Sequence, residues 1–254
     1  MSGHSKWAQI RRSKGVNDAR RGQLFTRLGR EIVVAVREGG GGDTNANFRL
    51  RMAVQRARDA NMPMDNIERT IKRTLGGIEG ANLEDNTYEG YGPAGTAILV
   101  QTLTENHNRT VAEVRNAFNK NGGNMGEAGC VGWLFEQKGV IEVALEGHDA
   151  DELSLEVLDM GADDVEPASP GDETLTIYTD PSDLEKVRQE LEKHNYTILK
   201  SESTMVPKTK VDLTTEKVVH QFIRLVEKLE DLDDVQNVYT NADFTEDLVA
   251  SYED

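Results

Sequence analysis

The sequence predicts an α+β protein, with a three-helix N-terminal domain followed by two ferredoxin-like α/β domains, one inserted in the other. Over the first third of the chain, apolar residues recur at helical spacing. Beyond it, short apolar runs of strand length alternate with helical stretches. One part of that alternation is a complete β-α-β-β-α-β set, the pattern of a ferredoxin-like sandwich.

The first third is predicted to hold a flexible basic arm (1–20) and a helical domain (21–77). The first helix has an apolar stripe that includes Leu28 and Ile32, and a run of glycines ends it. The second helix breaks before Pro63, because the residue preceding a proline resists the helical conformation. The three helices are expected over about 23–38, 46–60 and 63–75.

The rest of the chain is expected to form strands and helices after a linker over 77–92. The expected strands are 96–104, 131–135, 138–145, 163–168, 174–180, 196–207, 208–213 and 235–241. The expected helices are 108–123, 151–161, 181–195 and 215–232. Because 136–206 is a complete ferredoxin-like set, it is predicted to be inserted into a discontinuous domain made of 88–135 and 207–243.

Charge is distributed unevenly along the 254 residues, which carry 29 Lys and Arg against 45 Asp and Glu, a net of −16. Residues 1–76 hold 16 basic and 7 acidic side chains, a net of +9, which leaves 13 and 38, a net of −25, for the remainder. A basic segment attached to an acidic body indicates an anionic partner for the first third. The alternative is a set of solvated helix faces.

The chain is expected to be soluble and cytoplasmic, with no contact with a membrane. It has no apolar run long enough to span a bilayer, and its basic start lacks the apolar stretch of a secretory signal. Trp7 and Asp18 interrupt what would otherwise resemble a mitochondrial transit peptide. The single Cys130 excludes an internal disulfide framework and suits a reducing compartment.

No motif in the sequence indicates catalysis. The five histidines lack metal-ligand spacing, and no nucleophile elbow, zinc-protease or P-loop motif is present. GGNMGEAG (122–129) lacks the Lys-Ser/Thr of a phosphate loop and precedes a strand, so it is predicted to be a turn. YEGYGPAG (88–95) suits a tight turn before the next strand, with surface contacts by Tyr88 and Tyr91 as the alternative. We predict no enzyme, no metal, no cofactor and no small-molecule substrate.

The basic residues of the first third are the candidate nucleic-acid contacts, because each neutralised phosphate adds to a salt-dependent affinity. Trp7 would add a stacking surface for an unpaired base, or it docks the arm onto the helical domain. The candidate contacts are His4, Lys6, Trp7, Arg11, Arg12, Lys14, Arg20, Arg21, Arg27, Arg30, Arg49 and Arg51.

Five segments of the chain resemble the YebC/PmpR family. They are GHSKWAQIRRSK, RRGQLFTRLGREI, ANMPMDNIERTIKR, YEGYGPAGTAILV and NRTVAEVRNAFNKNGGNMGEAGCVGWLFEQKGVI. The resemblance is dense from Gly3 to Gly139 and looser to about Asp243. It departs from the family pattern at Gly29, where a larger apolar residue is usual, and at Arg11-Arg12, where a Lys/His mixture is more common.

The resemblance implies three domains, no catalytic activity, a cytoplasmic location in bacteria and contact with nucleic acid. Members of the family are widely labelled probable transcriptional regulators, and a mitochondrial branch activates translation of a cytochrome oxidase subunit. By position, the candidate contacts between His4 and Arg30 other than Trp7 match the family's basic region.

Three functions follow from these observations. The first is a DNA-binding transcriptional regulator of the YebC/PmpR type, although no helix carries an evident set of base-reading side chains. The alternative is a ribosome-associated translation factor, with the basic arm on ribosomal RNA and the acidic domains on ribosomal proteins. The third is a protein scaffold whose arm contacts an acidic partner. Oligomeric state stays open, because edge strands of either sheet can pair between chains.

Overall fold

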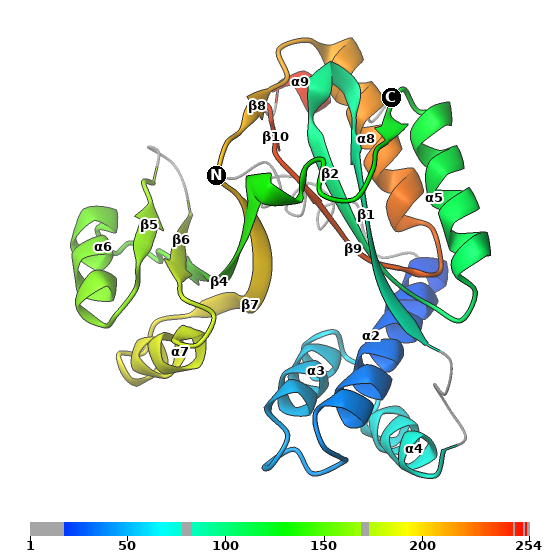
Figure 1. The fold of residues 1–254 in the computed structure, drawn as a ribbon. Helices are drawn as coiled ribbons and strands as arrows, with labels where there is room; N and C mark the ends of the chain where they lie inside the picture. The colour runs from blue at the N-terminus through cyan, green and yellow to red at the C-terminus, as the bar shows by residue number, and fades with distance from the viewer. Residues whose placement is uncertain (1–17, 78–82, 169–172, 246, 251, 253–254) are drawn as a thin grey trace.

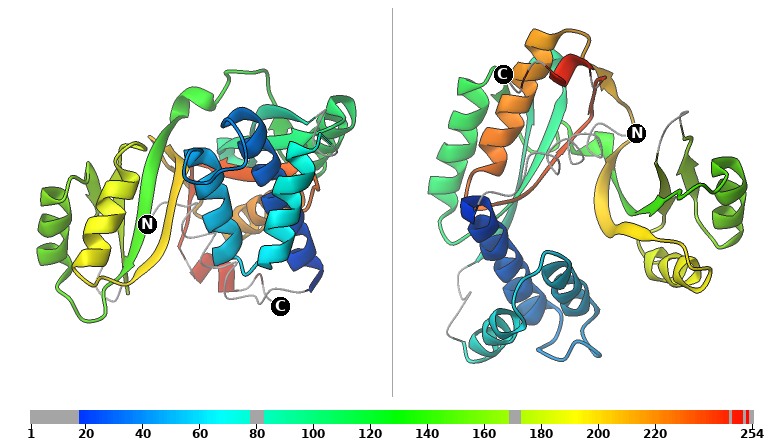
Figure 2. Two further views of the ribbon diagram at one scale, coloured as in Figure 1. Left: turned by 90° about the horizontal axis from the view of Figure 1, so that it is seen from below. Right: turned by 180° about the vertical axis from the view of Figure 1, so that it is seen from behind.

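The structure is a computed structural model that describes residues 18–77, 83–168, 173–245, 247–250 and 252. It comprises a helical domain, a larger sheet domain and a smaller sheet domain (Figure 1). The views in Figure 2 show the smaller sheet domain beside the larger one, and the helical domain at one end of the larger sheet. The predicted α+β class is confirmed.

The helical domain consists of α2 (Asp18–Glu38), α3 (Phe48–Asp59) and α4 (Met64–Leu75). The three predicted helices are confirmed, and the first begins earlier than Gln23. Their apolar stripes meet in one core. Asn47 organises the loop between α2 and α3: its side-chain oxygen caps α3 at the Leu50 amide, and its Nδ2 donates to the Ala35 carbonyl at 2.7 Å.

The larger sheet has the order β3-β1-β2-β9 with antiparallel neighbours. Its strands are β1 (Glu84–Tyr91), β2 (Ala97–Thr104), β3 (Asn124–Met125) and β9 (Val235–Thr240). Helices α5 (His107–Lys120) and α8 (Glu216–Glu230) cover one face (Figure 1). The largest apolar core of the described residues lies between these two helices and the sheet, and it includes Ile98, Phe118 and Phe222.

Three expectations for this sheet are wrong. Instead of a linker, the segment 77–92 contains β1. Instead of a strand, 131–135 forms the 3-10 turn η2 (Gly132–Leu134) and the first residue of the next strand. Within 208–213 only β8 (Val211–Asp212) forms, and it pairs with β10 (Ala242–Asp243) outside the sheet. In the observed sheet, β1 takes the inner position beside β2, and β3 lies at the edge.

Pairing with β2 holds β1 in the sheet despite its polar sequence, EDNTYEGY. The two strands pair along their whole length, from Glu84 opposite Thr104 to Tyr91 opposite Ala97. A Cβ on Gly90 would lie 2.7 Å from the Asn124 carbonyl oxygen and within 3 Å of the Phe118 ring, so this position has no room for a side chain.

The smaller sheet is formed by the inserted segment and has the order β5-β6-β4-β7. Its elements are β4 (Phe135–Ala144), α6 (Ala150–Asp159), β5 (Asp164–Glu166), β6 (Thr174–Thr179), α7 (Leu184–Lys193) and β7 (Ile198–Pro207). This is the predicted β-α-β-β-α-β set. The exact domain boundaries stay a prediction, since strand membership does not define the limits of independently folding units.

The start of β4 and the end of β7 attach the smaller domain to the larger one. Phe135 and Met205 pack with Leu99 and Tyr239, which lie on the face of the larger sheet that α5 and α8 leave free. The last helix of the described residues is α9 (Asp247–Ala250), whose Val249 joins the core of the larger domain.

Candidate nucleic-acid interface

The basic side chains of the helical domain lie mainly outside its apolar core, because they fall between the stripe positions of each helix. Leu28, Ile32, Leu50 and Ile67 are buried in that core. The described cations that are exposed are Arg37, Arg49, Arg51, Arg58, Arg69, Lys72 and Arg73. Because Glu38, Asp43, Asp59, Asp65 and Glu68 are also exposed, the described surface of the domain carries a small excess of cations.

Half of the predicted contacts cannot be placed. His4, Lys6, Trp7, Arg11, Arg12 and Lys14 lie outside the described residues. Arg20 and Arg21 belong to the first turn of α2, which sets their backbone position. For all of these residues, contact with nucleic acid stays a prediction.

Arg49 and Arg51 lie on the exposed surface of α3. Arg49 pairs with Glu38, an exposed carboxylate at the end of α2. The guanidinium carbon of Arg51 lies 5.5 Å from the centroid of the Phe48 ring. Exposed ion pairs such as Arg49–Glu38 contribute only about 0–1 kcal/mol to stability. A phosphate can therefore replace Glu38 as the partner of Arg49 at a small cost in free energy.

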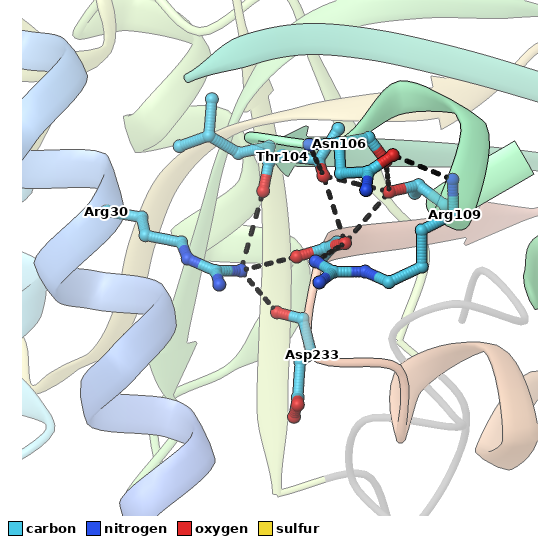
Figure 3. A network of polar contacts seen from close by, with 8 residues as sticks. Arg30, Thr104, Asn106, Arg109 and Asp233 are labelled. Carbon is cyan, nitrogen blue, oxygen red and sulfur yellow. Dashed lines mark hydrogen bonds and ion pairs between the residues drawn. The ribbon is translucent and has the colours of Figure 1, made fainter. Parts of the chain in front are cut away.

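Arg30 is instead used within the protein. Its guanidinium group reaches from α2 to the connection between α8 and β9, where it donates to the Asp233 carbonyl oxygen at 2.6 Å and to Asp234 Oδ1 at 3.2 Å (Figure 3). The Leu103 carbonyl at the end of β2 lies within 3.4 Å of the same nitrogen. Arg27, one turn earlier, is half-buried. Arg30 therefore fixes the helical domain on the larger sheet domain, and a role in nucleic-acid contact stays a prediction.

Asp234 is the acceptor on which this junction depends. Its side chain is 2 % exposed, and its second oxygen accepts from Arg109 at 2.7 Å, from the Thr110 hydroxyl at 2.8 Å and from the Thr104 hydroxyl at 3.0 Å. Burial alone would raise the pKa of Asp234, but hydrogen bonds from Arg109, Thr110 and Thr104 outweigh it and lower the pKa. The carboxylate is thus ionised near neutral pH and holds α2, β2 and α5 together.

The cations of α4 were not among the predicted site residues. Arg69, Lys72 and Arg73 are exposed at i, i+3 and i+4 spacing, and they line a shallow depression together with Asp65 and Glu68. Lys72 lies 3.6 Å from Glu68. The three cations fall at helical spacing on the side of α4 opposite the buried Ile67, and this pattern could have identified the cationic face from the sequence.

The glycine-rich segment 122–129, predicted to be a turn, begins and ends in turns, where Gly122 and Gly129 have φ of +78° and +86°, but β3 lies between them. The backbone amides at its end are occupied by a carboxylate of the protein itself. Glu89 accepts from the amides of Gly129 and Val131 at 2.7 Å each and from that of Gly132 at 2.6 Å. These amides are therefore not available to a phosphate.

Cys130, beside this turn, has no sign of activation. Burial raises the pKa of the Cys130 thiol, and the nearby Glu89 charge raises it further, whereas a nucleophilic cysteine requires the opposite shift. Among the described residues, no group of three or more His, Cys, Asp or Glu side chains is placed to hold a metal ion. In the same part of the chain, no helix combines the length and apolar character needed to cross a membrane.

Two family matches cover nearly the whole chain. Residues 5–77 match the TACO1/YebC protein N-terminal domain, and residues 83–242 match the TACO1/YebC second and third domain. The chain belongs to the TACO1/YebC family. The boundary between the two matches falls between α4 and β1, where the helical domain ends.

Relatives of the TACO1/YebC family span the full chain. A probable transcriptional regulatory protein from Chloroflexus aurantiacus is 54% identical and covers 100% of both chains. One from Dehalococcoides mccartyi is 50% identical over 99% of this chain and 98% of its own. The crystal structure of a conserved hypothetical protein from Aquifex aeolicus is 45% identical, with a TM-score of 0.78 over 90% of this chain and 93% of that one.

Proposed function

We propose that this protein regulates gene expression in the cytoplasm by binding nucleic acid, without catalysing a reaction. The observation that carries the proposal is the separation of charge: a net of +9 over residues 1–76 against −25 over the rest. Nucleic acid attracts the first segment and is repelled by the net charge of the acidic domains taken as a whole. The arm and the exposed faces of α3 and α4 would therefore make the approach.

Duplex DNA is the partner we favour, and a transcriptional regulator the function. The relatives are named probable transcriptional regulatory proteins. The short connection 60–63 between α3 and α4 is of helix-turn-helix length, and α4 presents Arg69, Lys72 and Arg73 on its surface. In this form of the proposal, α4 lies against the DNA and Arg49 and Arg51 contact phosphates.

A ribosome-associated translation factor is the second candidate, and the acidic residues of α4 favour it. Asp65 and Glu68 share the surface of α4 with its cations. A carboxylate near the start of a groove-binding helix is repelled by the DNA backbone. The specific base contacts of Lys and Arg are mainly to guanine, so these side chains alone recognise only part of a base sequence. Binding to the folded RNA of the ribosome requires no such readout, and the acidic domains would meet basic ribosomal proteins.

Crosslinking in living cells, followed by sequencing of both the DNA and the RNA recovered with the protein, distinguishes the two. Enrichment of discrete promoter DNA with ribosomal RNA at background supports the transcriptional regulator. Enrichment of ribosomal RNA at one position supports the translation factor. If neither nucleic acid is enriched above a control with Arg11, Arg12 and Lys14 reversed to Glu, the proposal fails in both forms.

A further inference from the structure

Trp133 is unusually exposed for a tryptophan in a folded domain. It lies in η2, its side chain is 67% exposed, and its indole Nε1 donates to the Cys130 carbonyl at 3.2 Å. The hydrogen bond holds one edge of the ring and leaves the ring largely accessible. Tryptophan is highly buried on average, so a ring left this exposed and held in one orientation is available to a ligand.

Tyr91 and Trp133 donate hydrogen bonds to the same acceptor, the Cys130 carbonyl. The Tyr91 side chain is 41% exposed, and its hydroxyl donates to the Cys130 carbonyl at 3.0 Å. One ring comes from the end of β1 and the other from η2, so two elements distant in sequence place two aromatic surfaces beside one carbonyl. Both side chains are already oriented by hydrogen bonds, which lowers the entropy cost of binding a ligand.

The backbone that carries these rings is fixed by Glu89. Its carboxylate binds the amides of Gly129, Val131 and Gly132, and its carbonyl accepts from the Gly126 amide at 2.8 Å. Burial would raise the pKa of Glu89, but the three backbone hydrogen bonds lower it. The carboxylate therefore stays ionised at neutral pH and keeps the segment from Gly126 to Gly132 in place.

One cation lies directly against the Trp133 backbone although the body of the protein is acidic. The exposed Lys208 donates from Nζ to the Trp133 carbonyl at 3.2 Å. Beyond the glycine turn, Lys120, Lys217 and Arg224 line a shallow pocket between the end of α5 and the start of α8. Glu216 lines the same pocket, which therefore holds three cations and one carboxylate.

The surroundings of the rings fit a nucleobase better than a protein surface. The other exposed large apolar side chains of the described chain lie on different elements: Leu24, Phe48, Met64, Leu75, Leu155, Leu158 and Leu199. None of them shares an element with Tyr91 or Trp133, whereas the core of a protein interface requires continuous apolar surface. An aromatic ring with a neighbouring lysine matches a base and its phosphate.

We propose that Tyr91 and Trp133 form a stacking platform for an unpaired base of single-stranded RNA, with Lys208 at the adjacent phosphate. Duplex DNA keeps its base faces inside the helix, whereas the loops and bulges of RNA display them. The platform is separate from the interface proposed above. Glu84, at the other end of β1, lies opposite Thr104, which bonds Asp234 at the junction with the helical domain. At about 3.4 Å per residue, β1 separates the two ends by more than 20 Å.

Tryptophan fluorescence tests the platform directly, because the chain has only two tryptophans. In a Trp7→Phe variant of the full chain, all tryptophan emission comes from Trp133. Titration with oligouridylate, which forms no stable secondary structure, should quench this emission to saturation. Affinity measured in parallel by anisotropy of a labelled oligouridylate should fall roughly tenfold in Trp133→Ala, as loss of one base–aromatic stack produces. Trp133→Phe should retain most of the affinity.

Leu155→Ala is the matched control, because Leu155 is 68% exposed but lies on α6, away from the platform. It should leave RNA affinity unchanged, and all variants should keep the melting temperature of the parent. Unchanged Trp133 emission overturns the proposal, whether or not RNA binds elsewhere on the chain. The proposal also fails if deletion of residues 1–17 changes the emission while RNA does not, since the chain's own arm would then be the occupant. Binding of duplex DNA, measured on the same variants, reports on the helical domain independently.

Discussion

Asp234 accepts hydrogen bonds from three elements of the fold: α2, the end of β2 and α5. Its neighbour Asp233 is exposed and offers Arg30 only its backbone carbonyl. Two adjacent aspartates in the acidic run EDLDD thus have different roles. One is a solvated charge, and the other is the buried centre of the junction between the helical domain and the larger sheet domain.

Asp234→Asn should reduce the free energy of unfolding by about 2–4 kcal/mol, because Arg30 and Arg109 lose a buried anionic acceptor. Asp233→Asn should change it by less than about 0.5 kcal/mol, since its side chain lies at the surface. Urea unfolding of both variants and the parent provides the measurement. Equal effects of the two substitutions would show that the junction does not depend on the buried carboxylate.

The pH dependence of stability follows from the lowered pKa of Asp234. A carboxyl group whose pKa is lower in the folded state stabilises the protein above its unfolded pKa of about 3.9, and this contribution is lost as pH falls through the folded pKa. The stability difference between the parent and Asp234→Asn should therefore be full at neutral pH and narrow below about pH 4. A difference that stays constant over this range would contradict the assignment.

At the scale of elements, β1 and α2 contain glycines whose surroundings predict opposite effects. Gly90 on β1 faces the Asn124 carbonyl and the Phe118 ring, so Gly90→Ala should destabilise the protein by about 1–3 kcal/mol. Gly29 on α2 has nothing within 4 Å of a Cβ, so Gly29→Ala should stabilise it by up to about 1 kcal/mol. Thermal unfolding measures both. A neutral Gly90→Ala would mean that β1 does not pack against α5 as described.

The sequence was sufficient for the helices and for the whole inserted segment, because their apolar periods are regular. It failed at β1, where only Tyr88 and Gly90 are buried and the strand is held by backbone pairing with β2. The strand predicted at 131–135 is wrong for a different reason. Val131 and Phe135 are apolar and pack on the free face of the larger sheet, but they lie on either side of the turn η2 and not in one strand. Periodicity reports which residues are buried, and it does not report which backbone pairs with which.

The candidate site was predictable as a charged region and not as a set of contacts. Exposure of Arg49 and Arg51 follows from their positions between the stripe residues of α3. The use of Arg30 within the protein depends on Asp233 and Asp234, more than 200 residues away in sequence. No local pattern distinguishes it from the neighbouring arginines, so only the folded chain shows the difference.

At the scale of the whole molecule, the basic helical domain and the acidic sheet domains are joined through Arg30 and Asp234, while residues 1–17 precede α2. Removal of residues 1–17 deletes Lys6, Arg11, Arg12 and Lys14 and none of the core residues of the described chain. We expect the melting temperature to stay nearly unchanged and nucleic-acid affinity to fall strongly. A large drop in melting temperature would mean that the arm is packed structure.

The central claim is that positive charge in the first third of the chain binds nucleic acid, and the salt dependence of affinity tests it most directly. Affinity for labelled duplex DNA and for a labelled RNA hairpin would be measured across salt concentrations. The variants are R11E/R12E and, as a control with the same charge change, K193E/K228E on exposed positions of α7 and α8.

We predict a steep slope of log affinity against log salt for the parent and the control, on at least one of the two nucleic acids. For R11E/R12E the slope should be shallower by about 1.4–1.8, since each of two lost phosphate contacts contributes about 0.7–0.9. Equal slopes for the two double variants, or no salt-dependent binding by the parent, would contradict the account.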